Sequence, residues 1–451
     1  MSLAPLKQAV FGAPEEIVQQ AVKLSDAVWE FAEPPFLEFR SSALMRETLE
    51  GQGFRVEQEF SAIPTAFAMA AGSGKPRIGI LAEYDALPDC GLEEGAFGHG
   101  CGHNLLGSAS ALAAMLTAHT MKQRGMRGTV VLYGCPAEET LAGKPYMARD
   151  GGFADLDAVL AWHPSDDTRV DAGSGAAMDS WAFEFFGRTA HGASAHGGRS
   201  ALDAAELMDH AVNILREHMP ENVRIHSVIT DGGGAPNVVP AYARSWYYVR
   251  GKHRAQVDEM SARVARCARG ACIATETKHK KRLLSAIYSR LRNDALADYA
   301  DDCLKAAGPV PFGDADKRAA KRLGLKGEFA EGIKDRNEAN KRASTDDDTV
   351  SRLAPMARFG FACRPKGVAG HHRDLTRLGK ARFAHTGMVH AGRTMALAAL
   401  GLMADRKTLA KAKREFAKRT KDFVFDPLLP KRQLPPQRDV IPKRPPRPEG
   451  E

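Results

Sequence analysis

Apolar runs and amphipathic stretches alternate along the first 165 residues. Apolar positions recur at helical spacing between Pro14 and Glu33, which predicts a helix that ends before Pro34 and Pro35. Three later segments are apolar almost throughout, as buried parallel strands are: residues 77–83, 128–134 and 158–162. Weaker strand patterns lie at 54–60 and 64–71, and helix patterns at 104–124 and 142–150. This alternation predicts a parallel α/β sheet with crossover helices.

The pattern changes near residue 175. Strand and helix patterns then follow in the order β-α-β-β-α-β, at residues 180–186, 200–217, 223–229, 243–250, 255–269 and 271–276. That order is typical of a ferredoxin-like α+β unit. Helix-rich α/β sequence returns after about residue 285, with helices expected at 387–404 and 406–421.

We therefore expect an α/β domain interrupted by a small α+β domain. The predicted segments are a first part of the α/β domain at 1–174, an inserted domain at 175–285, a second part of the α/β domain at 286–425 and a Pro/Arg/Lys-rich extended tail at 426–451.

Charge is distributed unevenly over the 451 residues, which carry a formal net charge of +8. Residues 401–451 hold 14 Lys/Arg against 7 Asp/Glu, so this end accounts for +7 and the rest of the chain for +1. A nearly neutral body gives no support to nucleic-acid binding there. A hydrophobic content of 44% excludes a wholly disordered chain.

The sequence indicates a cytoplasmic protein that does not enter a membrane. No apolar run approaches the ~18 residues that span a bilayer, and the first residues lack the pattern of a signal peptide. Seven scattered cysteines, an odd number, suit reduced thiols better than a disulfide framework.

Candidate metal ligands follow the ends of the predicted strands. Cys101 and His103 lie in a glycine-rich loop, the adjacent Glu138 and Glu139 follow the strand at 128–134, and His163 follows the strand at 158–162. Thiolate and imidazole suit zinc and neighbouring divalent metals, and one carboxylate can bind metal while its neighbour takes a proton from water. A purely structural role would explain each motif taken by itself. Three successive strand ends that each carry a ligand-type residue favour a metal site instead.

A late histidine would complete this site, because the α/β pattern resumes after the inserted domain. The candidates are His371, His372 and, further on, His385. Spacing alone leaves the choice between His371 and His372 open.

Several motifs together resemble a known enzyme family. They are the segments 82–88 (AEYDALP), 98–107 (GHGCGHNLLG), 136–139 (PAEE) and 162–164 (WHP), with further similarity at 187–191, 198–203, 235–240 and 344–346. The chain resembles the co-catalytic metallo-amidohydrolases of the aminoacylase/carboxypeptidase type, peptidase family M20, and within it the aminobenzoyl-glutamate utilization protein B group. The resemblance covers about residues 10–430.

The resemblance implies a zinc-exopeptidase-like catalytic domain with an inserted dimerisation domain that acts as a lid. It implies two divalent ions, Zn or Mn, held by Cys101, His103, Glu139, His163 and a C-terminal histidine, best His371. Glu138 would be the general base, and Asp85 would orient a metal-bound histidine.

The resemblance also assigns two residues of the inserted domain. His191 and Asn237 match lid residues that reach a substrate in the partner subunit's site, and His191 would help to stabilise the oxyanion. A homodimer is expected, or a hetero-oligomer with a related subunit.

The sequence thus predicts a metal-dependent amidohydrolase that cleaves the amide bond of an N-acyl or N-aroyl amino acid, such as aminobenzoyl-glutamate, or of a short peptide. The alternatives are a dipeptidase or aminoacylase of the same family, and a non-catalytic scaffold that keeps the fold and binds partners through its basic tail. Replacing Glu138 by Gln should spare the metal and remove turnover.

Overall fold

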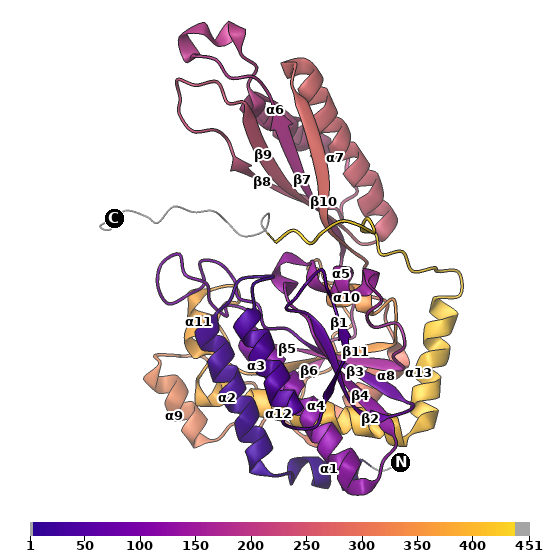
Figure 1. Ribbon diagram of the computed structural model, residues 1–451. Coiled ribbons are helices and arrows are strands. Elements are labelled where there is room, and N and C mark those ends of the chain that lie inside the picture. Colours follow the sequence, from indigo (N-terminus) through magenta and orange to yellow (C-terminus); the bar gives the residue numbers. More distant parts are fainter. Residues whose placement is uncertain (1–2, 438–451) are drawn as a thin grey trace.

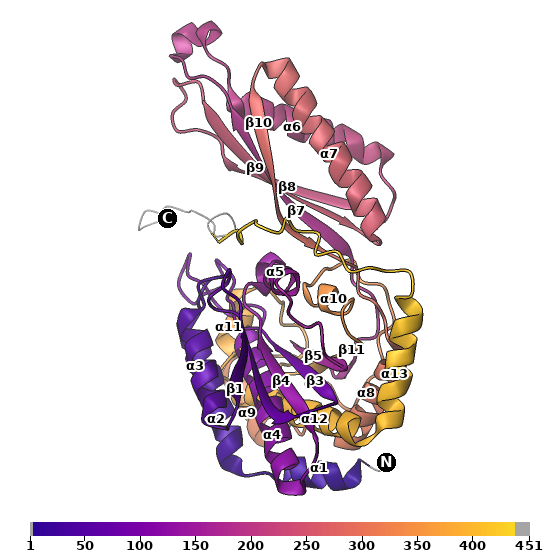
Figure 2. The ribbon, with the colours of Figure 1, turned by 45° about the vertical axis from the view of Figure 1, so that its right-hand side comes forward.

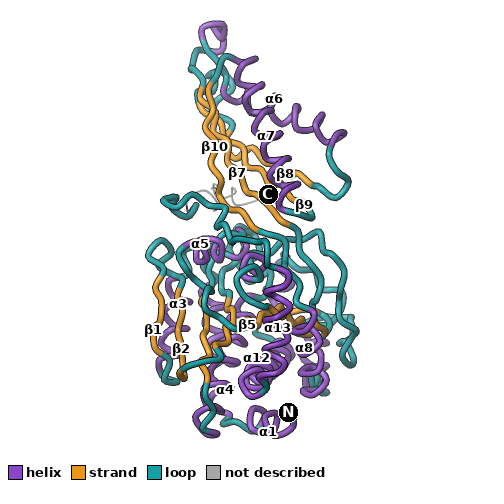
Figure 3. The backbone as a smooth tube through the Cα atoms, turned by 90° about the vertical axis from the view of Figure 1, so that its right-hand side faces the viewer, coloured by secondary structure: helices purple, strands orange, loops and turns teal. Residues whose placement is uncertain are grey.

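The computed structural model describes residues 3–437 and forms two β-sheets. Figure 1 shows them in two lobes, a larger one and a smaller one above it. We call these the catalytic lobe and the lid lobe, after the roles that the resemblance implies for them. Seen from the side, the lobes are joined by loop segments (Figure 3). No helix within residues 3–437 is long and apolar enough to cross a membrane.

The catalytic lobe is built on a seven-stranded mixed sheet with the order β1-β2-β4-β3-β5-β11-β6. Its strands are β1 (Arg55–Glu59), β2 (Phe67–Ser73), β3 (Arg77–Ala82), β4 (Gly128–Gly134), β5 (Ala158–Ser165), β6 (Arg169–Val170) and β11 (Met356–Ala362). The four central strands β4, β3, β5 and β11 run parallel, and β1, β2 and β6 pair antiparallel at the edges. The α/β prediction is confirmed for the centre of this sheet.

Helices pack around this sheet. They are α1 (Ala4–Phe11), α2 (Glu15–Phe31), α3 (Phe39–Glu50), α4 (His103–Arg124), α5 (Gly143–Arg149), α8 (Asp294–Ala307), α9 (Asp314–Arg322), α10 (Asp347–Val350), α11 (Arg373–Leu378), α12 (Arg382–Ala404) and α13 (Arg406–Arg419). Three short 3₁₀ turns lie at Glu138–Thr140, Gly192–Gly197 and Arg216–His218. The sequence pattern predicted α2, α4, α5, α12 and α13 but gave no signal for α1 and α3.

Helix α4 is central because small residues allow its neighbours to approach closely. It is buried along most of its length. Where α12 crosses it, a Cβ added to Gly392 would lie 3.0 Å from the carbonyl oxygen of Ala109. This packing fixes the N-terminus of α4, which carries His103, against the end of the parallel strands.

The lid lobe has the predicted β-α-β-β-α-β order. Its strands are β7 (Ala177–Phe186), β8 (Arg224–Asp231), β9 (Tyr242–Gly251) and β10 (Lys278–Ile287), and its helices are α6 (Ala201–Leu215) and α7 (Arg254–Thr275). The sheet order is β10-β7-β9-β8, with every pair antiparallel. Both helices lie on the same side of the sheet (Figure 2), where Phe183, Phe185 and Met208 form part of a separate core.

The expected short strand at 271–276 is wrong. Helix α7 continues to Thr275, and Ala271 and Cys272 pack into the lid core at helical spacing from Ala268. Glu276, with φ 52°, ends the helix, and the last strand is the basic segment β10. A short run of alanine, cysteine and β-branched residues fits a helix end and a strand equally well, so periodicity could not decide.

The segment that follows α13 packs between the two lobes (Figure 1). Tyr288 Oη donates to the carbonyl oxygen of Asp426 (2.8 Å), Arg149 Nη1 donates to that of Gln433 (2.6 Å), and the side chain of Leu429 is buried. The first part of the predicted tail, up to residue 437, therefore contains neither helix nor strand but is tied to the fold. Its remaining residues, 438–451, lie outside the described residues.

Candidate metal centre

The ends of three neighbouring parallel strands bring the candidate ligands together. Strand β3 ends at Ala82, shortly before Asp85, and β4 ends at Gly134, shortly before Glu138 and Glu139. Strand β5 itself carries His163. Because β4, β3 and β5 lie side by side and run parallel, their carboxyl ends meet at one edge of the sheet.

The glycine-rich loop that carries Cys101 reaches this edge through backbone conformations that only glycine adopts easily. Gly102 has φ 79°, and a Cβ there would lie 2.9 Å from Pro164 Cγ. A Cβ at Gly100 would lie 2.9 Å from Cys90 Sγ. The glycines thus allow the loop to pass close to the strand end that carries His163.

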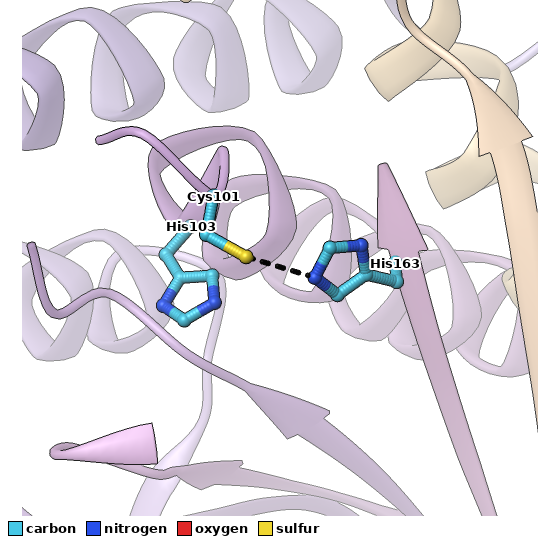
Figure 4. Close-up of side chains that lie close together, drawn as sticks. All are labelled: Cys101, His103 and His163. Carbon is cyan, nitrogen blue, oxygen red and sulfur yellow. Dashed lines mark hydrogen bonds between the residues drawn. The ribbon is translucent and has the colours of Figure 1, made fainter. Parts of the chain in front are cut away.

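Cys101 lies between His103 and His163 (Figure 4), with its Sγ 3.2 Å from His163 Nε2. The ligand atoms of these three residues all lie within 4.8 Å of one another. A second group of the same kind consists of Cys101, Glu139 and His371, so the two groups share the thiol of Cys101.

The structure distinguishes the three late histidines. His371 has its Nε2 3.7 Å from Glu139 Oε2, and its backbone N–H donates to Gly100 O (2.7 Å). His372 instead caps helix α11, where its Nδ1 accepts from the backbone N–H of Asp374. His385 lies elsewhere, beside Asp26. Of the three, His371 is the one placed at the cluster.

Asp85 lies behind the cluster and contacts two of its residues. Its Oδ1 lies 2.9 Å from His103 Nδ1, and its Oδ2 accepts from the backbone N–H of Glu139 (2.9 Å). Burial raises the pKa of Asp85, but the positive field of His103 and these hydrogen bonds outweigh it and bring the pKa below its ordinary value. An ionised Asp85 that binds Nδ1–H leaves His103 Nε2 free to face the cluster.

The buried donor atoms fit a divalent cation. Within residues 3–437, His103 Nε2 and Glu139 Oε1 are buried and have no hydrogen-bond partner. Burial raises the pKa of Cys101 to about 12 and, with help from the charge of Glu138, that of Glu139 to about 8. Burial, reinforced by Arg358, keeps the pKa of His163 well below its ordinary value. A bound divalent ion would stabilise the ionised forms of this thiol and carboxyl group, and the neutral His163 could donate a ring nitrogen to it.

Behind this cluster lies a buried ion network that sequence reasoning missed. Lys144 Nζ lies 2.6 Å from Glu83 Oε1 and 3.1 Å from Asp347 Oδ1, and it also pairs with Asp346. Glu83 Oε2 in turn lies 3.5 Å from His103 Nε2. A signal was present, since Glu83 directly follows β3 and Asp346 lies in a motif shared with the family, but nothing in the sequence pairs Lys144 with either.

The cluster opens into a cavity of about 690 Å³ between the lobes. Glu138 and Glu139 line it from the catalytic lobe, and Tyr248 and Arg250 of β9 line it from the lid lobe. A slightly larger hollow of about 790 Å³ lies among α1, α2 and α12, but it contains none of the grouped ligand atoms. The smaller cavity is therefore the candidate active site.

His191 and Asn237 lie together at a different place, on the lid lobe. The backbone N–H of Gly192, next to His191, donates to Asn237 O (2.7 Å), and His191 pairs with Val238 in an isolated bridge. Both residues are exposed, and neither lines the cavity of this chain. One chain therefore does not bring them to its own metal centre.

Known proteins are similar to this chain in sequence. Residues 79–317 match peptidase family M20/M25/M40. The chain is 35% identical to one of the subunits of p-aminobenzoyl-glutamate hydrolase from Escherichia coli, over 92% of its own length and 96% of that protein. It is 30% identical to Xaa-Arg dipeptidase of Mus musculus over 60% of this chain and 64% of that one.

Solved structures share the fold. An aminobenzoyl-glutamate utilization protein from Klebsiella pneumoniae aligns with 86% of this chain and 97% of its own at a TM-score of 0.58 and 19% identity. A dinuclear metal binding peptidase of the M20 family from Bacillus subtilis aligns with 87% and 99% at a TM-score of 0.55 and 18% identity. A cluster of thiol, imidazole and carboxylate ligands thus lies at the carboxyl edge of the parallel strands. The chain belongs to peptidase family M20/M25/M40, and the relatives named above are an amidohydrolase and a peptidase.

Proposed function

We propose that this protein hydrolyses the amide bond of an N-aroyl or N-acyl amino acid, such as aminobenzoyl-glutamate. The reaction would take place at a site that holds two divalent ions. The observation that carries this proposal is the pair of ligand groups that share Cys101, with Glu138 beside them in the same cavity. Similarity to the p-aminobenzoyl-glutamate hydrolase protein of Escherichia coli over 92% of the chain supports the substrate class.

Cys101, His103, Glu139, His163 and His371 would hold the ions, with Cys101 common to both. Bound there, the ions would supply Lewis acidity to the amide carbonyl and a lowered pKa to water. Zn and Mn suit this mixture of thiolate, imidazole and carboxylate.

Glu138 would act as the general base. Its side chain is 12% exposed and lines the cavity, whereas the neighbouring Glu139 is turned toward Cys101 and His371. The positive-φ residue Ala137 and the 3₁₀ turn from Glu138 to Thr140 make the two adjacent carboxylates diverge. Glu138 would take a proton from the attacking water and pass it to the leaving nitrogen.

Arg250 gives this site a preference for an amino-acid product. It reaches the cavity from β9 of the lid lobe, its guanidinium lies 5.5 Å from the ring of Tyr248, and its Nε is buried without a hydrogen-bond acceptor in the described chain. A guanidinium binds carboxylate in a planar, two-point arrangement, so Arg250 would hold the α-carboxylate of the substrate.

The lid lobe would also form the dimer interface. Strand β8 is an edge of the sheet and exposes Val228 (53%) and Ile229 (39%), and the adjacent α6 exposes Ile214 (58%). The opposite edge, β10, is rich in lysine, which opposes edge-to-edge pairing. Pairing through β8 would allow His191 and Asn237 of one copy to serve the site of the other, where His191 would stabilise the oxyanion.

A single charge at the apolar edge tests this assembly. Val228→Asp should convert a dimer to a monomer in size-exclusion chromatography with light scattering and should lower hydrolysis. Ile273→Asp is the matched control, because Ile273 on α7 is 74% exposed but lies away from β8. A dimer that survives Val228→Asp contradicts the proposed interface. A mixed assembly with a related chain is the other outcome of this test, since the similar protein of Escherichia coli is itself one of the subunits of its enzyme.

The hydrolysis itself is tested with the purified, metal-loaded protein. We expect about two ions per chain and release of aminobenzoate from aminobenzoyl-glutamate that stops on chelation. Faster turnover of dipeptides would assign the protein to the dipeptidase branch of the family, and metal binding without hydrolysis would favour a scaffold. We also propose that it acts in the cytoplasm, where its seven free cysteines would stay reduced.

A further inference from the structure

The candidate active-site cavity has a surplus of positive charge on its walls. Six arginine and lysine side chains line it, whereas the acidic side chains outside the metal cluster are two aspartates. This surplus matters only where a cation lacks a partner in the protein, because a paired cation is already neutralised.

Four of these six cations are paired. Arg169 donates from Nε to Asp167 (2.9 Å), and Lys341 Nζ lies 2.8 Å from Asp171 Oδ2. Arg290 forms ion pairs with Asp171 and with the buried Asp348 behind it, and Arg358 faces Asp347 at 3.7 Å. These four belong to the wall of the cavity and leave little charge for a ligand.

The other two cations, Arg250 and Arg364, have no carboxylate within ion-pair distance in residues 3–437. Arg364 follows β11 in the catalytic lobe, two residues after Ala362. Its strongest hydrogen-bond contact in the described chain is a long one, from Nη1 to the carbonyl oxygen of Pro164 (3.5 Å), and its Nε is buried without an acceptor. Pro164 is the neighbour of His163, so this guanidinium lies next to the metal centre.

A half-buried guanidinium without an anion is costly to maintain, and it is the feature expected of a site that awaits one. Arg250 and Arg364 come from different lobes and line the same cavity. One amino acid carries two carboxylates when its side chain is acidic, and two separate guanidinium groups match two separate carboxylates.

We propose that Arg364 binds the side-chain carboxylate of the substrate's amino acid and so makes the enzyme selective for N-acylated dicarboxylic amino acids, such as glutamate derivatives. The inference rests on the proposed function, in which Arg250 holds the α-carboxylate. Arg364 is a specificity residue for the leaving amino acid and takes no part in the proton transfers of Glu138.

The test compares two substrates that differ only in the charge of the side chain, aminobenzoyl-glutamate and aminobenzoyl-glutamine. In Arg364→Gln, the KM for aminobenzoyl-glutamate should rise about 10- to 100-fold, the range expected for losing a charge-assisted hydrogen bond in a partly buried site. The KM for aminobenzoyl-glutamine should change by less than about twofold. Arg364→Lys should restore part of the preference.

Arg169→Gln is the matched control. It removes the same charge from the same cavity, but Arg169 is already paired with Asp167. The ratio of kcat/KM values for the glutamate and glutamine substrates should therefore stay near that of the wild type. Metal content is measured in each variant, because Arg364 also contacts the segment next to His163.

An equal loss on both substrates in Arg364→Gln would overturn the inference and would mean that Arg364 acts through the metal centre. Titration of free glutamate and glutamine by calorimetry separates this result from a failure of the proposed function. The wild type could hydrolyse neither amide yet bind glutamate, with that binding weakened selectively in Arg364→Gln. This result would mean that the proposed hydrolysis is wrong, whereas the proposed binding of the side-chain carboxylate by Arg364 is correct. If the wild type discriminates neither amides nor free amino acids by side-chain charge, the recognition is wrong.

Discussion

Replacing Lys144 by methionine should destabilise the catalytic lobe strongly, although the two side chains have similar length. The Lys144 side chain is fully buried, and its ammonium group is in contact with three buried carboxylates, those of Glu83, Asp346 and Asp347. At an effective dielectric constant of about 20, the pair with the ionised Asp347 at ~3 Å is worth about 5 kcal/mol before the cost of burying the charges. Removing one partner of a buried ion pair costs about 3–5 kcal/mol net, because the remaining charge is left uncompensated.

The loss should depend on pH. Burial raises the pKa of Asp347, but Lys144 and Arg358 outweigh it and hold the pKa below its ordinary value, so this carboxylate stabilises the fold above about pH 4 and loses that effect as the pH falls. Burial raises the pKa of Asp346 to about 8, so this group costs stability as the pH rises from about 4 to 8. Without Lys144 the first contribution disappears and the second cost grows. The first loss is the same at pH 7 and pH 9, because both values lie well above the pKa of an unfolded aspartate, whereas the second makes the deficit larger at pH 9, above the wild-type pKa of about 8.

The measurement is thermal unfolding of the metal-free protein at both pH values, followed by circular dichroism. For a lobe of more than about 250 residues, in which 1 kcal/mol shifts the Tm by less than about 2 °C, a loss of 3–5 kcal/mol corresponds to a fall in Tm of about 4–7 °C. Lys341→Met is the control: Lys341 also pairs with an aspartate, but its side chain is 43% exposed, so its Tm should stay within about 2 °C of the wild type. A similarly small change in Lys144→Met, or a deficit that is smaller at pH 9 than at pH 7, would refute the electrostatic reasoning.

Three further changes test the site and the C-terminal segment. Glu138→Gln should keep the metal content, measured by atomic absorption, and lower kcat by about 10²–10⁴-fold; activity near that of the wild type would exclude Glu138 as the base. His371→Ala should lose about one ion per chain in the same measurement, whereas His372→Ala should lose none, and the opposite result would exchange their roles. Deleting 426–451 should lower the Tm, because it removes the hydrogen bonds to both lobes and the buried side chain in that segment, while deleting only 438–451 removes none of these contacts. Equal Tm values for the two truncations would show that the packed segment contributes nothing to stability.

The sequence predicted most strands of the two sheets but placed none at β11, which is one of the four central strands of the larger sheet. Strands β3, β4 and β5 are buried on both faces and therefore read as continuous apolar runs. Helices α1 and α3 gave no comparable signal, and the end of α7 was mistaken for a strand, because the apolar residues there are few and their spacing fits either element.

The candidate ligands were visible in the sequence because each lies at or after the end of a buried strand. A parallel sheet brings such positions to one edge whatever its side chains are, so strand order alone predicts that Cys101, Glu139 and His163 lie close together. The sequence also concentrated the positive charge in the last 51 residues. It left open which of His371 and His372 belongs to the site.

Tertiary structure decided that choice and everything that depends on contacts between distant segments. His371 joins the cluster because its backbone is hydrogen-bonded to Gly100, and Lys144 meets Asp346 only because α5 packs against α10. Arg364 looks no different in the sequence from the paired arginines of the same cavity. Whether a charged side chain has a partner is a property of packing, since the partner comes from another part of the chain, and only the folded structure shows which charges remain for a substrate.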